Sequence, residues 1–220
     1  MLELKQVSFS FGSKRVFENI DLTFHTDKVY GIVGANGVGK TTLFRLIASF
    51  YKKQEGSILW HGKALEQENV AFLPTDPFFY TYMNGLQYLE IVLHKDKENL
   101  HKAIELSSRL NLPLDQLVDA YSTGMKKKLA FVASRFLNRA INILDEPFSG
   151  VDLESNEHLQ DLLKEKEKGK LTLVSSHILT TMNELCDEII FIQKGFKLSS
   201  FLPTDYELLR KQIKASSSIT

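Results

Sequence analysis

Apolar and polar residues alternate in two runs near the start of the chain. The first run holds Leu2, Leu4, Val7, Phe9 and Phe11, and the second holds Val16, Phe17, Ile20, Leu22 and Phe24. Alternation with a period of two is typical of strands with one buried face. The segment Gly12-Ser13-Lys14 between the runs favours a turn. We therefore expect an antiparallel, half-buried sheet here.

A continuous apolar run at residues 28–34, KVYGIVG, predicts a buried strand that leads through a glycine-rich loop into a helix. The helix is expected to turn its apolar positions inward, at Leu43, Leu46, Ile47 and Phe50. Residues 56–65, GSILWHGKAL, indicate a hairpin, and residues 69–74, NVAFLP, indicate another buried strand.

From residue 76 to 121 the spacing of apolar positions becomes helical, which predicts an inserted all-helical segment. Strand patterns return at 141–145, 171–176 and 188–200 and alternate with helical ones, as in an α/β fold with a parallel sheet. The expected organisation is one domain over residues 1–220. Its core covers 1–75 and 122–202, and residues 203–220 form a C-terminal helix with a disordered SSSIT end.

Composition excludes some classes of partner. The 220 residues include 27 Lys and Arg and 27 Asp and Glu, a formal net charge of zero, so no overall field attracts nucleic acid, and we expect no nucleic-acid partner. The single cysteine, Cys186, is expected to be a small buried hydrophobic residue. No apolar stretch reaches 18 residues, so neither a membrane span nor an export signal is expected.

Residues 34–42, GANGVGKTT, fit the pattern Gly-x4-Gly-Lys-Thr. In such a phosphate loop, glycines let backbone N–H groups approach phosphate oxygens. Lys40 is expected to reach the β- and γ-phosphates, and Thr41 to place its hydroxyl on Mg²⁺. The alternative is an ordinary glycine-rich turn between a strand and a helix.

Residues 140–147, AINILDEP, run from an apolar strand into two carboxylates. Asp145 at the carboxyl end of a buried strand would lie beside the phosphate loop, where it can bind Mg²⁺. Glu146 would project toward the γ-phosphate and polarise the attacking water. The alternative is an acidic strand end that is merely solvated.

Residues 121–129, YSTGMKKKL, place Ser122, Thr123 and Gly124 at the start of a predicted helix, a second N-terminus suited to an anion. The phosphates of one nucleotide need only one such anion-binding site, and residues 34–42 already provide it. Two copies arranged head to tail would let each of these helices cap the γ-phosphate bound by the other copy. The alternative is a helix N-cap without a ligand. Lys126 to Lys128 are expected to spread around this helix, and we assign them no binding partner.

The order of these segments, followed by SGVD at 149–152 and SSH at 175–177, resembles the ATP-binding cassette (ABC) family over nearly the whole chain. It looks most like the nucleotide-binding subunits of bacterial exporter-type transporters. The resemblance implies a P-loop NTPase fold of the α/β class, with a mixed-sheet core, an antiparallel β subdomain and an inserted helical subdomain.

The resemblance also implies roles for individual residues. Glu146 and His177 match the catalytic glutamate and the switch histidine, Asp152 matches the D-loop at 149–152, and Thr41 and Asp145 match the Mg²⁺ ligands. The signature for the opposite subunit's ATP corresponds to Ser122, Thr123 and Gly124. The implied ATP-binding residues are Phe11, Gly34, Asn36, Gly37, Gly39, Lys40, Thr41 and Thr42. Two ordinary alternatives are a sheet-edge His177 and a core Phe11 that does not stack on adenine.

Two departures from the family pattern bear on function. The signature reads Tyr-Ser-Thr-Gly-Met instead of Leu-Ser-Gly-Gly-Gln, a variant that resembles exporters of drugs, antibiotics or polymers. Thr75 stands where the family usually has a glutamine that reaches toward Mg²⁺, and its side chain is shorter by about two atoms. Thr75 and Asp76 are both candidates for this place at the metal, and slow hydrolysis is the alternative. Residues 77–83, PFFYTYM, either receive a helix of a membrane subunit or form the core of the insert.

The resulting hypothesis is an ATPase subunit that binds ATP and Mg²⁺ and forms a head-to-tail dimer with itself or a homologous subunit. It would drive a separate transmembrane permease, an exporter, from the cytoplasmic face of the cell membrane. A soluble, ATP-switched regulatory or assembly module without a transport partner is the first alternative. A small-molecule or nucleotide kinase is the second, although it leaves SGVD, SSH and the signature unexplained.

Overall fold

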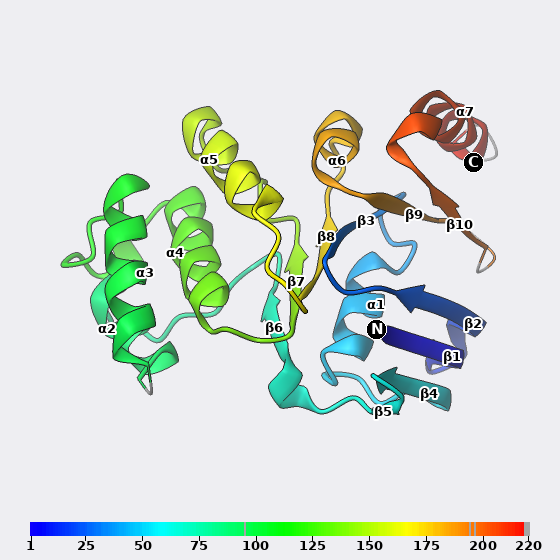
Figure 1. Ribbon diagram of the computed structural model, residues 1–220, viewed down its shortest axis with the longest axis horizontal. Helices are drawn as coiled ribbons and strands as arrows, with labels where there is room; N and C mark the ends of the chain where they lie inside the picture. Colours follow the sequence, from blue (N-terminus) through cyan, green and yellow to red (C-terminus); the bar gives the residue numbers. More distant parts are fainter. Residues whose placement is uncertain (95, 194, 196, 218–220) are drawn as a thin grey trace.

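The computed structural model describes residues 1–94, 96–193, 195 and 197–217. Two β-sheets form the body of this part of the chain, and helices cover the larger sheet on both faces (Figure 1). This architecture confirms the predicted α/β class.

The smaller sheet is antiparallel and has the strand order β2-β1-β4-β5. It consists of β1 (Leu2–Phe11), β2 (Lys14–Phe24), β4 (Glu55–Trp60) and β5 (Lys63–Ala64). The two N-terminal strands and the later hairpin are therefore confirmed. Period-two burial holds at the start of β1, where Leu2 and Leu4 are buried, and it is interrupted by a register shift before Val7, after which three consecutive residues are buried.

The larger sheet has the order β10-β9-β3-β8-β7-β6. Its strands are β3 (Lys28–Gly34), β6 (Val70–Leu73), β7 (Ile141–Asp145), β8 (Leu171–Ser175), β9 (Glu188–Ile192) and β10 (Leu198–Phe201). Neighbouring strands from β9 to β6 are parallel, and β10 pairs antiparallel with β9 at one edge. The core is thus the mixed sheet that the family resemblance implied.

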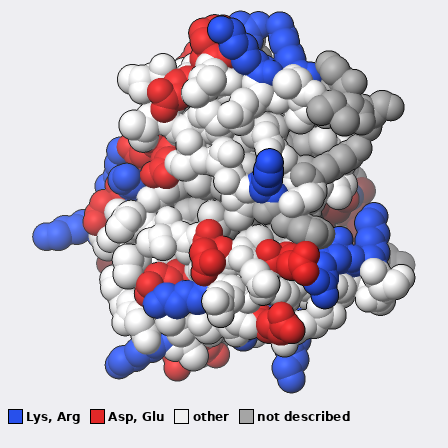
Figure 2. Space-filling model, turned by 90° about the vertical axis from the view of Figure 1, so that its right-hand side faces the viewer, with Lys and Arg blue, Asp and Glu red and all other residues white. Residues whose placement is uncertain are grey.

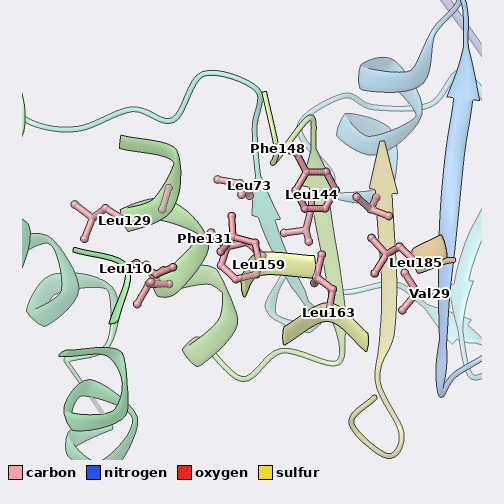
Figure 3. Close-up of a cluster of buried hydrophobic side chains, with 14 of the residues drawn as sticks. Val29, Leu73, Leu110, Leu129, Phe131, Leu144, Phe148, Leu159, Leu163 and Leu185 are labelled. Carbon is pink, nitrogen blue, oxygen red and sulfur yellow. The ribbon is translucent and has the colours of Figure 1, made fainter. Parts of the chain in front are cut away.

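Both faces of this sheet are buried, which explains why its strands read as continuous apolar runs. In β3, Tyr30 and Ile32 pack toward α1 (Lys40–Ile47) and the antiparallel sheet. Val29 and Val33 point to the opposite face, where the other helices lie. Figure 3 shows this second cluster, in which strand residues such as Val29 lie among side chains of the helices.

The helices of the second face are α2 (Gly85–Val92), α3 (Lys97–Arg109), α4 (Thr123–Phe136), α5 (Leu153–Lys164), α6 (Leu179–Leu185) and α7 (Tyr206–Ser217). Of these, α2 and α3 form the outer end of the molecule, and α4 lies between α3 and the sheet edge at β6 (Figure 1). Residues 76–121 contain α2, α3, a short 3₁₀ turn at Val118–Ala120 and an isolated bridge between Asn84 and Leu117. The division of the chain into core and insert stays a prediction.

Some expectations about single residues were wrong and others were confirmed. Phe50 is 60% exposed and does not face inward, because α1 ends at Ile47 and Ser49 takes a φ of +61°, which redirects the chain. The predicted disorder of SSSIT is wrong for Ser216 and Ser217, which belong to α7, and residues 218–220 lie outside the described residues. Cys186 is buried as expected, and burial raises the pKa of its thiol.

Charge on the described surface is mixed. On the face that Figure 2 shows, basic and acidic side chains are interspersed rather than gathered by sign, in keeping with the net charge of zero. Among the described residues, no helix combines the length and apolar character needed to cross a bilayer.

Candidate functional site

The phosphate loop connects β3 to α1 at the carboxyl edge of the parallel strands. Gly37 and Gly39 adopt φ values of +75° and +119°, a region of backbone conformation that residues other than glycine rarely adopt. Gly34 must lack a side chain for a different reason, since a Cβ there would lie 2.6 Å from the carbonyl oxygen of Ile192. The loop therefore keeps its backbone close to its neighbours and presents the N-terminus of an eight-residue helix.

Lys40, the first residue of α1, folds its side chain back over the loop. Its Nζ donates hydrogen bonds to the carbonyl oxygens of Gly34, at 2.8 Å, and Ala35, at 3.2 Å. Burial lowers the pKa of its ammonium, and the nearby Glu146 and Asp145 carboxylates oppose this effect. Because an ammonium has three donors and two are used, one N–H is left for an anion in the loop.

Asp145, the last residue of β7, is 2% exposed and lies between two hydroxyls. Thr41 Oγ1 donates to its Oδ2 at 2.7 Å, and Ser175 Oγ donates to its Oδ1 at 2.6 Å. The second contact follows from strand register, since Asp145 and Ser175 pair across β7 and β8. A carboxylate next to a hydroxyl at a phosphate loop is a set of hard oxygen donors that fits Mg²⁺ with nucleotide phosphates and water as its further ligands.

Glu146 follows directly and has an unusual backbone. Its φ is +54°, which is costly for a residue with a side chain and persists only where the surroundings enforce it. Its N–H donates to Ser175 Oγ at 3.0 Å, and its carbonyl oxygen accepts from Lys127 Nζ at 3.0 Å. The main chain of Glu146 is thus held from both sides.

His177 lies beside this glutamate just after β8. Its Nδ1 is 3.0 Å from Glu146 Oε2, and its side chain is 63% exposed while that of Glu146 is 17% exposed. The imidazole therefore stays open to a ligand at the mouth of the site and contacts the candidate catalytic carboxylate. This hydrogen-bonded position just after β8 fits a histidine at the sheet edge as well as a contact with the γ-phosphate, and the role of His177 stays a prediction.

The signature residues lie apart from the phosphate loop of the same chain. Ser122 caps α4 by accepting from the N–H of Met125 at 3.2 Å, and both Ser122 and Thr123 are exposed. Gly124 is buried against the D-loop, where a Cβ would lie 2.3 Å from the carbonyl oxygen of Gly150. In the part of the chain that the structure describes, no hydrogen bond or ion pair joins residues 122–124 to residues 34–42.

Asp152 in the D-loop caps α5 and contacts α4. It accepts from the N–H of Ser155 at 2.9 Å, and Lys128 Nζ lies 3.2 Å from its Oδ2. The Ser155 backbone bond, with contributions from the Ser155 and Lys128 side chains, lowers the pKa of Asp152 to about 2. Of the three lysines expected to spread around this helix, Lys127 and Lys128 are buried and hydrogen-bonded within the chain.

Phe11, at the end of β1, is 47% exposed and stands edge-on to the rings of Phe9 and Tyr51, at centroid distances of 4.8 and 5.3 Å. It is not a core aromatic. Thr75 is half-buried and Asp76 is exposed, and within the described chain neither makes a hydrogen bond or ion pair with Asp145 or Glu146. Whether either takes the place of the family's glutamine stays a prediction.

The aromatic segment at 77–83 lies mainly at the surface. Phe78, Tyr80 and Tyr82 are 74%, 64% and 83% exposed, so they do not form the core of the insert. Phe78 and the exposed Phe50 border a groove of about 560 Å³ between the sheet edge and the helical segment. Its other lining includes Phe72, Tyr88 and residues of α4.

Comparison with known proteins decides the family. The sequence profile described as ABC transporter matches residues 17–149, more than half of the chain. The chain belongs to this family. It is 30% identical over 207 residues to YhcH of Bacillus subtilis strain 168, an uncharacterised ABC transporter ATP-binding protein, a match that covers 89% of this chain and 68% of the relative.

Other relatives and structures agree. The lantibiotic transport ATP-binding protein SrtF of Streptococcus pyogenes is 26% identical, over 89% of this chain and 88% of the relative. An ATP-binding subunit of an ABC transporter superposes with a TM-score of 0.86 at 24% identity, covering 97% of this chain and 94% of that chain. The dimeric, ADP- and Pi-bound cassette MJ0796 superposes with a TM-score of 0.81 at 19% identity, covering 92% and 99%. These two structures share the fold.

As a member of this family the protein is an ATP-binding ATPase, which removes the kinase alternative. Two polar residues at the site were missed by sequence reasoning. Ser175 ends a strand parallel to the one that ends in Asp145, so strand pairing was a signal for it. Lys127 had no such signal, because the rotation of α4 decides which of three consecutive lysines turns inward.

Proposed function

We propose that this protein is the ATP-hydrolysing subunit of an ABC transporter, which closes head to tail with a second cassette around two ATP molecules. The observation that carries the proposal is the convergence of Lys40, Thr41, Asp145, Glu146 and His177 on one side of the phosphate loop. The signature residues of the same chain lie elsewhere. The site is therefore half of a shared one.

Within the site, the loop residues Gly34, Asn36, Gly37, Gly39, Lys40, Thr41 and Thr42 bind the phosphates. The exposed ring of Phe11 offers a face on which adenine can stack. Thr41 and Asp145 would hold Mg²⁺, which would supply positive charge to neutralise the nucleotide phosphates. Glu146 orients and polarises the attacking water, and the exposed imidazole of His177 beside it contacts the γ-phosphate.

The second cassette supplies Ser122, Thr123 and Gly124 to this ATP. The position of these residues at the N-terminus of α4 supports this role: Ser122 and Thr123 are exposed, and among the described residues Ser122 Oγ acts only as an acceptor. Bound ATP then favours the closed dimer through its contacts with both copies, and hydrolysis removes that bias. The dimeric cassette bound to ADP and Pi has the same fold, which supports this arrangement.

A permease subunit is proposed to dock at the groove beside residues 77–83. The groove is bordered by exposed aromatic side chains, which are typical of protein interfaces and fit the apolar face of a short helix. Docking there would hold the protein at the cytoplasmic face of the membrane. The YSTGM signature and the likeness to a lantibiotic transport protein favour export.

The decisive experiment measures the mass of purified Glu146→Gln by light scattering in Mg-ATP and then in Mg-ADP. We expect a dimer in ATP and a monomer in ADP, because binding persists while hydrolysis stops. Ser122→Arg in the same background should abolish the dimer, whereas Ser108→Arg, at an exposed serine on α3, should not. Lys40→Ala should abolish nucleotide binding itself.

A Glu146→Gln variant that binds ATP and stays monomeric would contradict the shared site. Copurification from membranes tests the permease separately. Recovery of a membrane protein with the wild type, lost on Phe78→Asp, supports a transporter. A chain that dimerises with ATP but recovers no membrane protein favours the soluble regulatory module instead.

A further inference from the structure

Two adjacent lysines of α4 are almost fully buried. Lys127 is 3% exposed and Lys128 is 6% exposed, although lysine is rarely buried without partners. Both lie one turn after the signature, on the helix whose N-terminus is assigned to the opposite subunit's ATP. Their partners are different, and the difference separates a structural role from a role at the catalytic site.

Lys128 acts as an anchor for neighbouring elements. Its Nζ donates to the carbonyl oxygen of Leu110 at the end of α3, at 2.9 Å, and to Ser155 Oγ at 3.1 Å, and it pairs with Asp152 at 3.2 Å. These contacts bind α3, α4 and the start of α5 together. None of them reaches the carboxylates at the phosphate loop.

Lys127 points instead to the catalytic edge, by which we mean the end of β7 at Asp145 and Glu146. Its Nζ donates to the carbonyl oxygen of Glu146 at 3.0 Å. Burial lowers the pKa of this ammonium, and the charges of Asp76, Glu146 and Asp145 act in the opposite direction. Lys127 thus lies where the signature helix, the catalytic edge and the start of the helical insert meet.

The bond has a specific structural consequence. Glu146 holds a φ of +54°, and its peptide groups are fixed by Ser175 on one side and Lys127 on the other. Without the second bond, the backbone can relax from this strained region and the carboxylate changes direction. The contact between Glu146 Oε2 and His177 Nδ1 would be lost with it.

We propose that Lys127 is a positioning residue for ATP hydrolysis, which holds Glu146 in its working orientation through the main chain. Because Lys127 belongs to α4, the orientation of the carboxylate at one ATP depends on the signature helix that contacts the other ATP. A shift of that helix on dimer closure is thereby passed to Glu146. The inference rests on the proposed role of Glu146 as the group that polarises water.

The test compares Lys127→Met with Lys126→Met, the same change at a half-buried lysine of the same helix, and with Lys127→Arg, which keeps a charged donor. Steady-state ATPase rates and ATP binding are measured for all three. We expect Lys127→Met to lower kcat by about 10- to 100-fold, the range for a misplaced catalytic group, with KM unchanged within about twofold. Lys126→Met should match the wild type, and Lys127→Arg should recover most of the loss.

A Lys127→Met variant with wild-type kcat overturns the proposal, and so does a loss of the same size in Lys126→Met. If Lys127→Arg is as slow as Lys127→Met, or if Lys127→Met fails to fold, Lys127 is a packing residue only. Glu146→Gln, measured in parallel, separates the proposed role of Glu146 in catalysis from the proposed role of Lys127 in positioning it. Wild-type turnover in Glu146→Gln refutes the role of Glu146 itself, whatever Lys127→Met shows.

Discussion

Ser175→Ala removes a hydroxyl that makes two hydrogen bonds at the heart of the site. Ser175 is fully buried, donates to Asp145 Oδ1 at 2.6 Å and accepts from the N–H of Glu146 at 3.0 Å. The change leaves the carboxylate with one hydroxyl partner, Thr41, and leaves a buried N–H unpaired. Both effects destabilise the folded state, because a buried polar group that loses its hydrogen-bond partner still pays the free energy of its removal from water.

The magnitude follows from the two bonds. A hydrogen bond to a charged group contributes about 1.5–3 kcal/mol and a neutral one about 0.5–1.5 kcal/mol, so the variant should lose about 2–4 kcal/mol of unfolding free energy. In a chain of 220 residues, each kcal/mol lowers Tm by roughly 2–4 °C, and the expected decrease is therefore roughly 5–15 °C. Because Asp145 and Glu146 both lose a constraint, kcat should also fall, by roughly tenfold or more.

Urea unfolding and thermal melting of the apo protein measure the first effect, and steady-state ATPase assays measure the second. Ser176→Ala is the matched control, since Ser176 is also buried but its Oγ, within the described part of the chain, accepts only from the N–H of Ile178, at 3.0 Å. That variant should lose about 0.5–1.5 kcal/mol and keep its kcat. Equal losses of stability and activity in the two variants would refute the reasoning from Ser175.

Two further predictions concern the signature helix and the D-loop. Gly124→Ala should lower the unfolding free energy by up to about 2 kcal/mol, since overpacking against Gly150 costs about 1–3 kcal/mol and the helix gains only about 1 kcal/mol. If urea unfolding shows a more stable variant, the backbone at Gly150 moves away from the added methyl group at little cost, contrary to this reasoning. Asp152→Asn should be less stable than the wild type at neutral pH. Because folding lowers the pKa of Asp152 from 3.8 to about 2, its contribution is complete above pH 4 and is lost as pH falls through about 2. Melting curves of both proteins should converge over this interval, and a constant difference would exclude the charge as its source.

Local sequence determined the strands, the phosphate loop and the pair Asp145-Glu146. The partial alternation in β1 and β2, and the apolar runs of β3 and β7, follow from which faces of each strand are buried. Chemistry at the ends of those strands was also predictable, because parallel strands bring their carboxyl ends to one edge. The 2.7 Å contact between Thr41 and Asp145, 104 positions apart, is the result.

The tertiary structure decided what depends on rotation and register. Phe50 lies at a helical spacing but beyond the last turn of α1, so the pattern alone placed it inside. Three consecutive lysines look alike in sequence, and only the packing of α4 against the sheet edge turns Lys127 toward Glu146 and Lys128 toward Asp152. A periodic pattern reports how each element divides between core and solvent. Which buried polar atoms meet depends on how elements distant in sequence are set against one another.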